Sequence, residues 1–172
     1  MRMRKIVRLA ILSLTLPVFS LQAFSENVPP LSASARADKV LVLKSRRVLL
    51  LMKGDEVLKR YIVSLGNPVG PKIRQGDHKT PEGTYVLDRH NANSQFYRSI
   101  HISYPNADDV ARAKKLGVRA GGDLFIHGLP NDFHGHSDAL GDWTEGCIAV
   151  TDAEMDEIWR MVADGTPIEI KP

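Results

Sequence analysis

The run KVLVLKSRRVLLLMKGDEVLKRYIVSLG, residues 39–66, decides the fold class of this chain. Apolar and polar side chains alternate along much of it, which is the spacing of β-strands with one buried face. The turn Lys53–Asp55, centred on Gly54, separates two such segments and predicts a β-hairpin. On the second arm we expect four residues to share one face: Val57, Tyr61, Val63 and Leu65. The domain therefore begins as a β-sheet.

Later segments extend the strand pattern and add helices. Further strands are predicted at residues 80–90, 99–105, 121–128 and 166–172, and the third of these, GGDLFIHG, is short and apolar enough to be an interior strand. A helix is predicted at residues 106–117, with Asn106 as its N-cap and Gly117 as its stop.

The segment TDAEMDEIWRMV, residues 151–162, predicts a second helix. Thr151 and Glu154 match a capping box, in which each side chain hydrogen-bonds the free backbone N–H of the other residue. An apolar stripe follows, formed by Met155, Ile158, Trp159 and Val162. The expected fold class is mainly β with one or two helices (α+β), the helices lying against a mixed sheet that forms a sandwich or barrel.

The first 25 residues have the pattern of a secretory signal peptide. Four basic residues precede an apolar run, and Ala23 and Ser25 have the small-residue spacing of a cleavage site after Ser25. An uncleaved membrane anchor is the alternative, but the run is shorter than the roughly 20 residues that a spanning helix needs. We expect export to the periplasm, a linker at residues 26–38 and one folded domain at residues 39–172.

The charge balance argues against nucleic acid as a partner. The chain carries 23 Lys and Arg against 20 Asp and Glu, and removing the predicted signal peptide leaves 19 against 20. The pI of about 9.1 therefore derives largely from the targeting segment, and the remaining domain is near neutral.

Cys147 is the single cysteine of the chain. In an exported protein an unpaired cysteine is a reactive thiol, an intermolecular bridge or a small buried hydrophobe, and the count alone leaves these open. Its neighbours favour reactivity, because Gly146 allows close backbone approach and a nucleophilic thiol needs free backbone N–H groups beside it. Among six histidines, His127 stands out as a candidate base because it ends a predicted strand, directly before Gly128.

These segments together resemble the L,D-transpeptidase family, the YkuD domain. The resemblance rests on His127-Gly128 followed by TEGCI at residues 144–148, and on TPEGTY (80–85), HISYPN (101–106) and GGDLFIHG in the same order. It covers nearly everything from Lys39 to Lys171. It implies a YkuD-like mixed β-sandwich or barrel and an exported bacterial cell-wall enzyme that needs no metal or cofactor.

The resemblance also implies roles for residues. Cys147 would attack the carbonyl at the L-centre of meso-diaminopimelate in a peptidoglycan stem peptide, release D-Ala and form a thioester, with His127 as proton acceptor and donor. Gly146, Thr144 and Gly128 would support the oxyanion turn, and Tyr104 and Glu145 are candidate substrate-binding residues. An amine of a second stem would give a cross-link, whereas water would give hydrolysis. A monomer is expected.

Two positions depart from the family pattern. Glu145 stands where the family often has His, and Ala149 where it often has Arg or Asn. The run GCIAVTD resembles a branch that includes an amidase releasing a wall-attached lipoprotein, so such a lipoprotein is a possible partner.

Two other function classes remain open. The first is a zinc peptidase that uses His127, His134 and His136 with Asp132 and Asp138, although the run NDFHGHSDALGD (131–142) is better interpreted as a substrate-facing flap. The second is a wall-binding module without catalysis.

Overall fold

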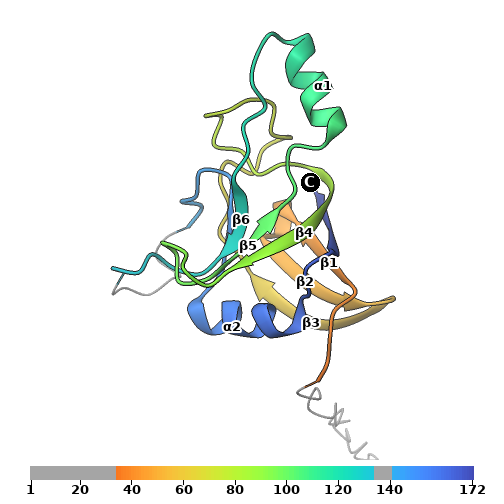
Figure 1. Cartoon of the computed structure of the whole chain (residues 1–172), viewed down its shortest axis with the longest axis vertical. Helices are drawn as coiled ribbons and strands as arrows, with labels where there is room; N and C mark the ends of the chain where they lie inside the picture. Colours follow the sequence, from red (N-terminus) through yellow and green to blue (C-terminus); the bar gives the residue numbers. More distant parts are fainter. Residues whose placement is uncertain (1–33, 134–140) are drawn as a thin grey trace, which may run out of the picture. The chain divides into compact units, whose positions relative to one another are not determined.

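The computed structural model describes residues 34–133 and 141–172, which contain one eight-stranded sheet, two α-helices and a short 3-10 helix (Figure 1). The strands are β1 (Lys39–Leu43), β2 (Val48–Lys53), β3 (Glu56–Ile62), β4 (Gly83–Asn91), β5 (Ser99–Ile102), β6 (Leu124–His127), β7 (Ile148–Ala149) and β8 (Thr166–Lys171). The helices are α1 (Ala107–Lys115), α2 (Asp152–Met161) and η1 (Lys44–Arg46). The prediction of a mainly β domain with two helices is confirmed.

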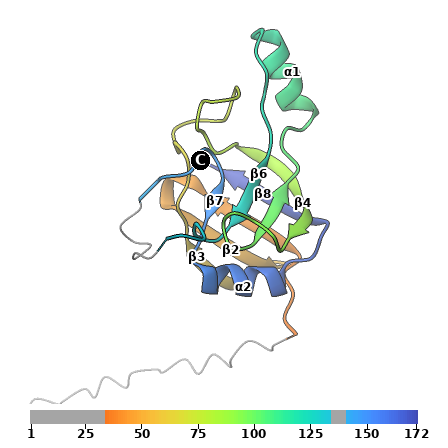
Figure 2. The ribbon, with the colours of Figure 1, turned by 60° about the vertical axis from the view of Figure 1, so that its left-hand side comes forward.

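The sheet is mixed and nearly closes on itself. Its order is β3-β2-β1-β8-β4-β5-β6-β7, with parallel pairing of β1 with β8 and of β6 with β7. The two edges meet beyond β3, where Ser64 and Ala149 exchange both backbone hydrogen bonds at 2.9 and 2.8 Å. The expectation of a sandwich or barrel is therefore met by a strongly curved sheet, which is visible in both ribbon views (Figures 1 and 2).

The predicted hairpin is formed by β2 and β3, with Gly54 at φ +57° in the turn. One detail of its second arm differs from expectation. The pairing shifts between Leu51 and Met52, so that Leu58 is an extra residue on β3. Because this bulge reverses the alternation, Tyr61, Val63 and Leu65 are buried as expected but Val57 is 49% exposed.

Helix α2 packs on the core along the predicted stripe. Met155 and Ile158 are fully buried and Val162 is 3% exposed, whereas Trp159 is half-buried at the edge. The capping box forms as predicted, with Thr151 and Glu154 each bonding the other's backbone N–H. Helix α1 has its own capping box at Asn106 and lies beyond the opposite end of the sheet from α2 (Figure 2).

The folded domain begins inside the predicted linker. Ala37 is 7% exposed and its N–H donates to the Met161 carbonyl, while the N–H of Asp38 donates to Met52. The expected boundary at residue 39 is thus a few residues late, because the apolar Ala37 joins the core. The signal peptide prediction (1–25) and most of the linker lie outside the described residues. Within the described residues, no helix has the length and apolar character to cross a membrane.

Candidate active site

Two neighbouring parallel strands bring His127 and Cys147 to one face of the sheet. Ile126 of β6 pairs with Ile148 of β7, and both side chains are fully buried in the core. Cys147 and Ala149 flank Ile148 along the extended β7 backbone, and His127 pairs with Ala149. Because side chains alternate across a strand, all three project from the face opposite the two isoleucines. Residues 20 apart in the chain thereby lie on one face of two adjacent strands, two positions apart in register.

The environment of His127 fixes its tautomer. His127 is 3% exposed, and its Nδ1 lies 2.7 Å from the Gly128 carbonyl oxygen, which can only accept a hydrogen bond. Nδ1 therefore carries the proton and Nε2 keeps its lone pair. Phe96 packs on the ring at a centroid distance of 4.5 Å, and Trp143 contacts it edge-on at 5.7 Å. Burial lowers the pKa of the imidazole, against a smaller upward contribution from the Gly128 carbonyl.

Cys147 is half-buried with a free thiol. Its Sγ lies 4.0 Å from the Asp123 carbonyl oxygen. Burial raises the thiol pKa, partly offset by a backbone hydrogen bond from Phe125 and by the charge of Lys72. Both members of the pair are thus shifted toward their uncharged forms.

The turn before the cysteine is built by Thr144. Its hydroxyl donates to the Cys147 carbonyl at 2.7 Å and accepts the N–H of Gly146 at 3.2 Å, which closes residues 144–147 into a compact loop. The Gly146 N–H is therefore already used, although the sequence suggested it as an oxyanion donor. Within the described residues, the N–H of Cys147 has no partner. The Glu145 N–H likewise has no partner there, and of these two donors the Cys147 N–H belongs to the residue that carries the thiol.

Gly146 meets a requirement that no other residue can satisfy. Its φ is +118°, and a Cβ there would lie 2.5 Å from the Lys79 carbonyl oxygen. Gly66 packs against it from the other side, since a Cβ on Gly66 would lie 2.6 Å from the Gly146 nitrogen. The turn of the cysteine is thus held between Gly66 and Lys79, and no sequence pattern indicated the role of Gly66.

A buried lysine holds this supporting segment in place. Lys44, fully buried in η1, donates from Nζ to the Gly70 and Thr80 carbonyls at 2.7 and 2.8 Å and to Glu82 at 2.9 Å. Thr80 in turn accepts the N–H of Gly66 at 3.3 Å. The long connection from β3 to β4 is thereby fixed against the cysteine turn.

The family model of the YkuD L,D-transpeptidase catalytic domain matches residues 37–170. The chain belongs to this family. Escherichia coli YafK, which is named as an L,D-transpeptidase, is 35% identical over 130 residues, covering 72% of this chain and 46% of YafK. The recognition made from His127-Gly128 and residues 144–148 is thus confirmed.

Solved structures agree with this family assignment. Campylobacter jejuni Pgp2, a helical cell shape determining protein, is 27% identical with a TM-score of 0.62, covering 77% of this chain and 46% of Pgp2. An L,D-transpeptidase from Xylanimonas cellulosilytica has the same fold at 18% identity and a TM-score of 0.53, covering 80% of this chain and 62% of that one. The chain spans less than half the length of YafK and of Pgp2.

The two candidate substrate residues of this family member have different surroundings. Tyr104 is 3% exposed and its hydroxyl donates to the Ala120 carbonyl at 3.1 Å, while burial raises its pKa to about 12. Tyr104 also lines a pocket together with Asp123, and its contact with substrate stays a prediction. Glu145, by contrast, is exposed beside the cysteine turn and pairs with the exposed His78. Its role in substrate binding stays a prediction.

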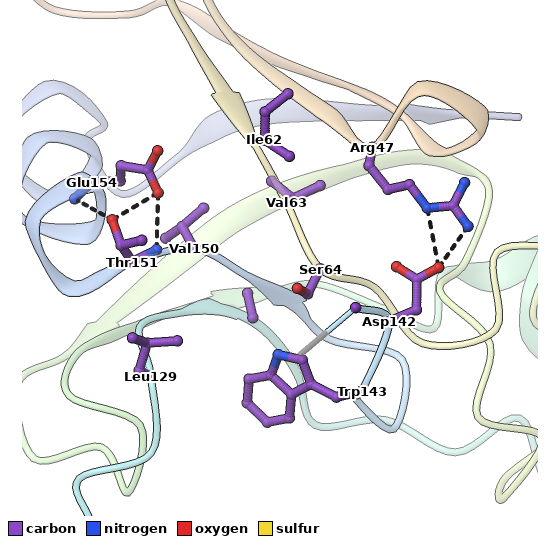
Figure 3. Close-up of a pocket in the computed structure, with 12 residues that line it drawn as sticks. Arg47, Ile62, Val63, Ser64, Leu129, Asp142, Trp143, Val150, Thr151 and Glu154 are labelled. Carbon is purple, nitrogen blue, oxygen red and sulfur yellow. Dashed lines mark hydrogen bonds and ion pairs between the residues drawn. The ribbon is translucent and has the colours of Figure 1, made fainter. Parts of the chain in front are cut away.

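Two pockets flank the family's Cys/His pair. One, of about 610 Å³, is lined by Trp143 and Ala149 and contains the Arg47–Asp142 ion pair (Figure 3). The other, of about 740 Å³, runs along α1 to Asp123, whose carbonyl contacts the Cys147 thiol. Ala149 explains part of the first pocket, since it offers only a methyl group where the family often has an arginine.

Some predictions fall where the structure is silent. His134, His136 and Asp138, on which the zinc interpretation depended, lie outside the described residues, as does most of the expected flap. In the described part of the chain, no group of three or more His, Cys, Asp or Glu side chains could hold a metal ion.

Proposed function

We propose that this chain is an exported L,D-transpeptidase that acts on peptidoglycan stem peptides through a thioester on Cys147. The observation that carries the proposal is the placement of the thiol and the imidazole on one face of the adjacent strands β6 and β7, with Nδ1 of the imidazole committed to Gly128 and Nε2 free. Membership of the YkuD family supports the substrate class.

The first half-reaction forms the thioester. Cys147 Sγ attacks the carbonyl carbon at the L-centre of meso-diaminopimelate, and its proton passes to His127 Nε2. The carbonyl π-electrons move to oxygen, where the N–H of Cys147 stabilises the negative charge; one such donor contributes about 3 kcal/mol of barrier lowering. When the C–N bond breaks, the imidazolium returns the proton to the leaving amine of D-Ala.

The second half-reaction transfers the acyl group. An amine of a second stem attacks the thioester carbonyl, its proton passes to His127 Nε2, and the C–S bond breaks with the proton returning to Sγ. If water attacks instead, the product is a free carboxylate, and the enzyme is an L,D-carboxypeptidase or an amidase that releases a wall-attached lipoprotein. The two pockets are lined by Ala149, which pairs with His127, and by Asp123, which contacts the thiol, and they leave room for a donor and an acceptor stem.

The charge state of the resting pair supports general base catalysis. Since burial raises the thiol pKa and lowers the imidazole pKa, the neutral thiol and neutral imidazole are the resting forms at neutral pH. The proton therefore moves as the carbon–sulfur bond forms, as in serine enzymes, rather than before substrate binds. The enzyme needs no cofactor for this chemistry.

Localisation in the periplasm is part of the proposal. It rests on the basic head and apolar run of residues 1–25 and on the wall substrate that the family implies.

The test uses purified enzyme and a tetrapeptide muropeptide, with and without an acceptor stem. We expect release of D-Ala, a thioester adduct on intact protein by mass spectrometry, and a cross-linked dimer when the acceptor is present. C147A and H127A should give no product, while H90A, which removes a histidine paired with Asp164, should keep the wild-type rate. A tripeptide product alone would assign hydrolysis, and absence of any adduct with the folded wild-type protein would refute the proposal.

A further inference from the structure

We propose that Asp152 is a positioning residue, which holds and polarises His127 through the single peptide group that joins Gly128 to Leu129. The carbonyl of this peptide accepts the Nδ1–H of His127 at 2.7 Å. The N–H of the same peptide donates to Asp152 Oδ1 at 2.9 Å. A carboxylate, a peptide and an imidazole therefore form one continuous hydrogen-bonded chain that ends at the proposed base, His127. The inference deepens the proposed function and rests on it.

The peptide cannot easily move out of this chain. A Cβ on Gly128 would lie 2.6 Å from Asp152 Oδ1 and 2.9 Å from the Tyr97 Cβ, so the backbone and the carboxylate are in close contact. The Gly128 N–H is also held, by the Phe96 and Arg98 carbonyls at 3.1 and 3.2 Å. Asp152 itself is the first residue of α2, whose capping box fixes the start of the helix.

Hydrogen bonds in series strengthen one another. An amide whose N–H donates to a carboxylate carries more negative charge on its carbonyl oxygen, which makes that oxygen a better acceptor for Nδ1–H. This favours the tautomer in which Nε2 is free. It favours the imidazolium still more, since the positive ring is the stronger donor and the carboxylate charge is of opposite sign.

No other charge competes for this role in the described surroundings of the ring. The segment that covers the imidazole from one side contributes the apolar Phe96, and the segment before the cysteine contributes Trp143. The charges on these two segments are paired elsewhere: Arg98 with Asp156, and Asp142 with Arg47. Across the sheet, β5 places Ser99 opposite His127, and β7 contributes Ala149. Asp152 is thus the carboxylate that reaches the imidazole, through one peptide.

The test measures alkylation of Cys147 by iodoacetamide between pH 4 and 9, a reaction that does not need peptidoglycan. Because the chain has one cysteine, every modified protein is modified at the site. The rate reaches a plateau once the imidazole has lost its proton, so the acid limb reports the pKa of His127. In D152A we expect the plateau to fall about tenfold, the lower end of what outer-shell partners of histidine cost in metal sites. We expect the limb to move down by about 0.3 pH unit, because an imidazolium without the carboxylate is less stable.

Two further variants separate positioning from folding. D152N keeps an oxygen for the Leu129 N–H but loses the charge, so it should fall between the wild type and D152A. E157A removes a carboxylate further along α2 that pairs with Lys59 and Tyr61 and does not contact the Gly128–Leu129 peptide, so its plateau and limb should match the wild type. If D152A does not fold, a downward limb shift in D152N supports the inference and an unshifted limb overturns it.

Nuclear magnetic resonance of ¹⁵N-histidine provides an independent readout. The Nδ1–H proton of His127 should move upfield in D152N and D152A as its hydrogen bond weakens, and should stay in place in E157A. An unshifted acid limb in folded D152A or D152N, or an equal loss of rate in E157A, would overturn the inference. Failure of the muropeptide reaction alone would refute the proposed function and leave these readouts decisive for Asp152.

Discussion

Replacing Gly146 by alanine tests the idea that crowding against Lys79 shapes the cysteine turn. At φ +118° an alanine is strained by about 1–3 kcal/mol whatever surrounds it. The added Cβ would also lie 2.5 Å from the Lys79 carbonyl oxygen and 3.4 Å from Leu124 Cδ2. Overpacking of this kind costs a further ~1–3 kcal/mol, because the carbonyl belongs to the backbone and cannot rotate away.

Gly165 is the matched control. Its φ is +94°, yet a Cβ there would meet nothing within 4 Å, so G165A carries the conformational strain without the collision. We expect G146A to unfold roughly 3–10 °C below G165A in a thermal scan, taking about 3 °C for each kcal/mol in a domain of this size. Equilibrium urea unfolding at 25 °C should give the same order of variants. Alkylation of Cys147 should also be slower in G146A, at a temperature where both variants are folded.

The measurement decides between two accounts of this glycine. If G146A and G165A are equally stable, the collision with Lys79 does not exist in solution, and Gly146 is required only for its backbone angle. If G146A is less stable but alkylates at the wild-type rate, the turn yields without moving the thiol. Either result would refute the argument that the β3–β4 connection positions the nucleophile.

Three further predictions concern charged groups. Because burial lowers the pKa of His127, the acid limb of the pH–rate profile for thioester formation should lie below pH 6.5. The imidazole of the unfolded chain binds its proton at higher pH than that of the folded protein, so the free energy of unfolding should fall as the pH drops below about 6.5. H127A should lack this pH dependence in urea titrations. Burial raises the pKa of the Asp77 carboxyl, but backbone N–H groups and Lys72 lower it more, to about 2. The folded protein should therefore lose about 2 kcal/mol of stability between pH 4 and pH 2. D77A should lack that amount of stability already at pH 7. K44M should lower the free energy of unfolding by ~3 kcal/mol, because it leaves Glu82 and two carbonyls without their buried ammonium partner. K39M, which breaks an exposed pair with Glu169, should lower it by less than about 1 kcal/mol. Equal losses in the two variants would contradict the role given to Lys44.

The sequence predicted those parts of the fold that are governed by local pattern. Strand alternation, the Gly54 turn, the Asn106 N-cap and the Thr151–Glu154 capping box depend on residues close together in the chain, and each formed where expected. The prediction that Val57 shares a face with Tyr61 was wrong, because a bulge cannot be recognised from the alternation of one strand until its partner strand is known. Strand β7 was missed because two residues, Ile148 and Ala149, are too few to show a period.

The residues of the candidate site also differ in whether local sequence signals could identify them. His127 and Cys147 could be named because a strand end and a glycine turn are local signals. Gly66, Lys44 and Phe96 could not, since their contacts come from segments 30 to 100 residues away and no spacing rule links them to the cysteine. The hydroxyl partner of Tyr104, the Ala120 carbonyl, could not be predicted either, because it lies 16 residues away along the chain.

The position of β8 has a consequence for how the molecule assembles. This strand lies between β1 and β4, so it joins a half-sheet made early in the chain to the half-sheet that bears the thiol. Residues 166–171 must therefore be synthesised before the two halves of the sheet can pair. Proteolytic removal of these residues would break the pairing of the β1–β3 half with the half that carries His127 and Cys147. Pairing between strands so far apart in the chain slows folding, and it also means that an incomplete chain is inactive.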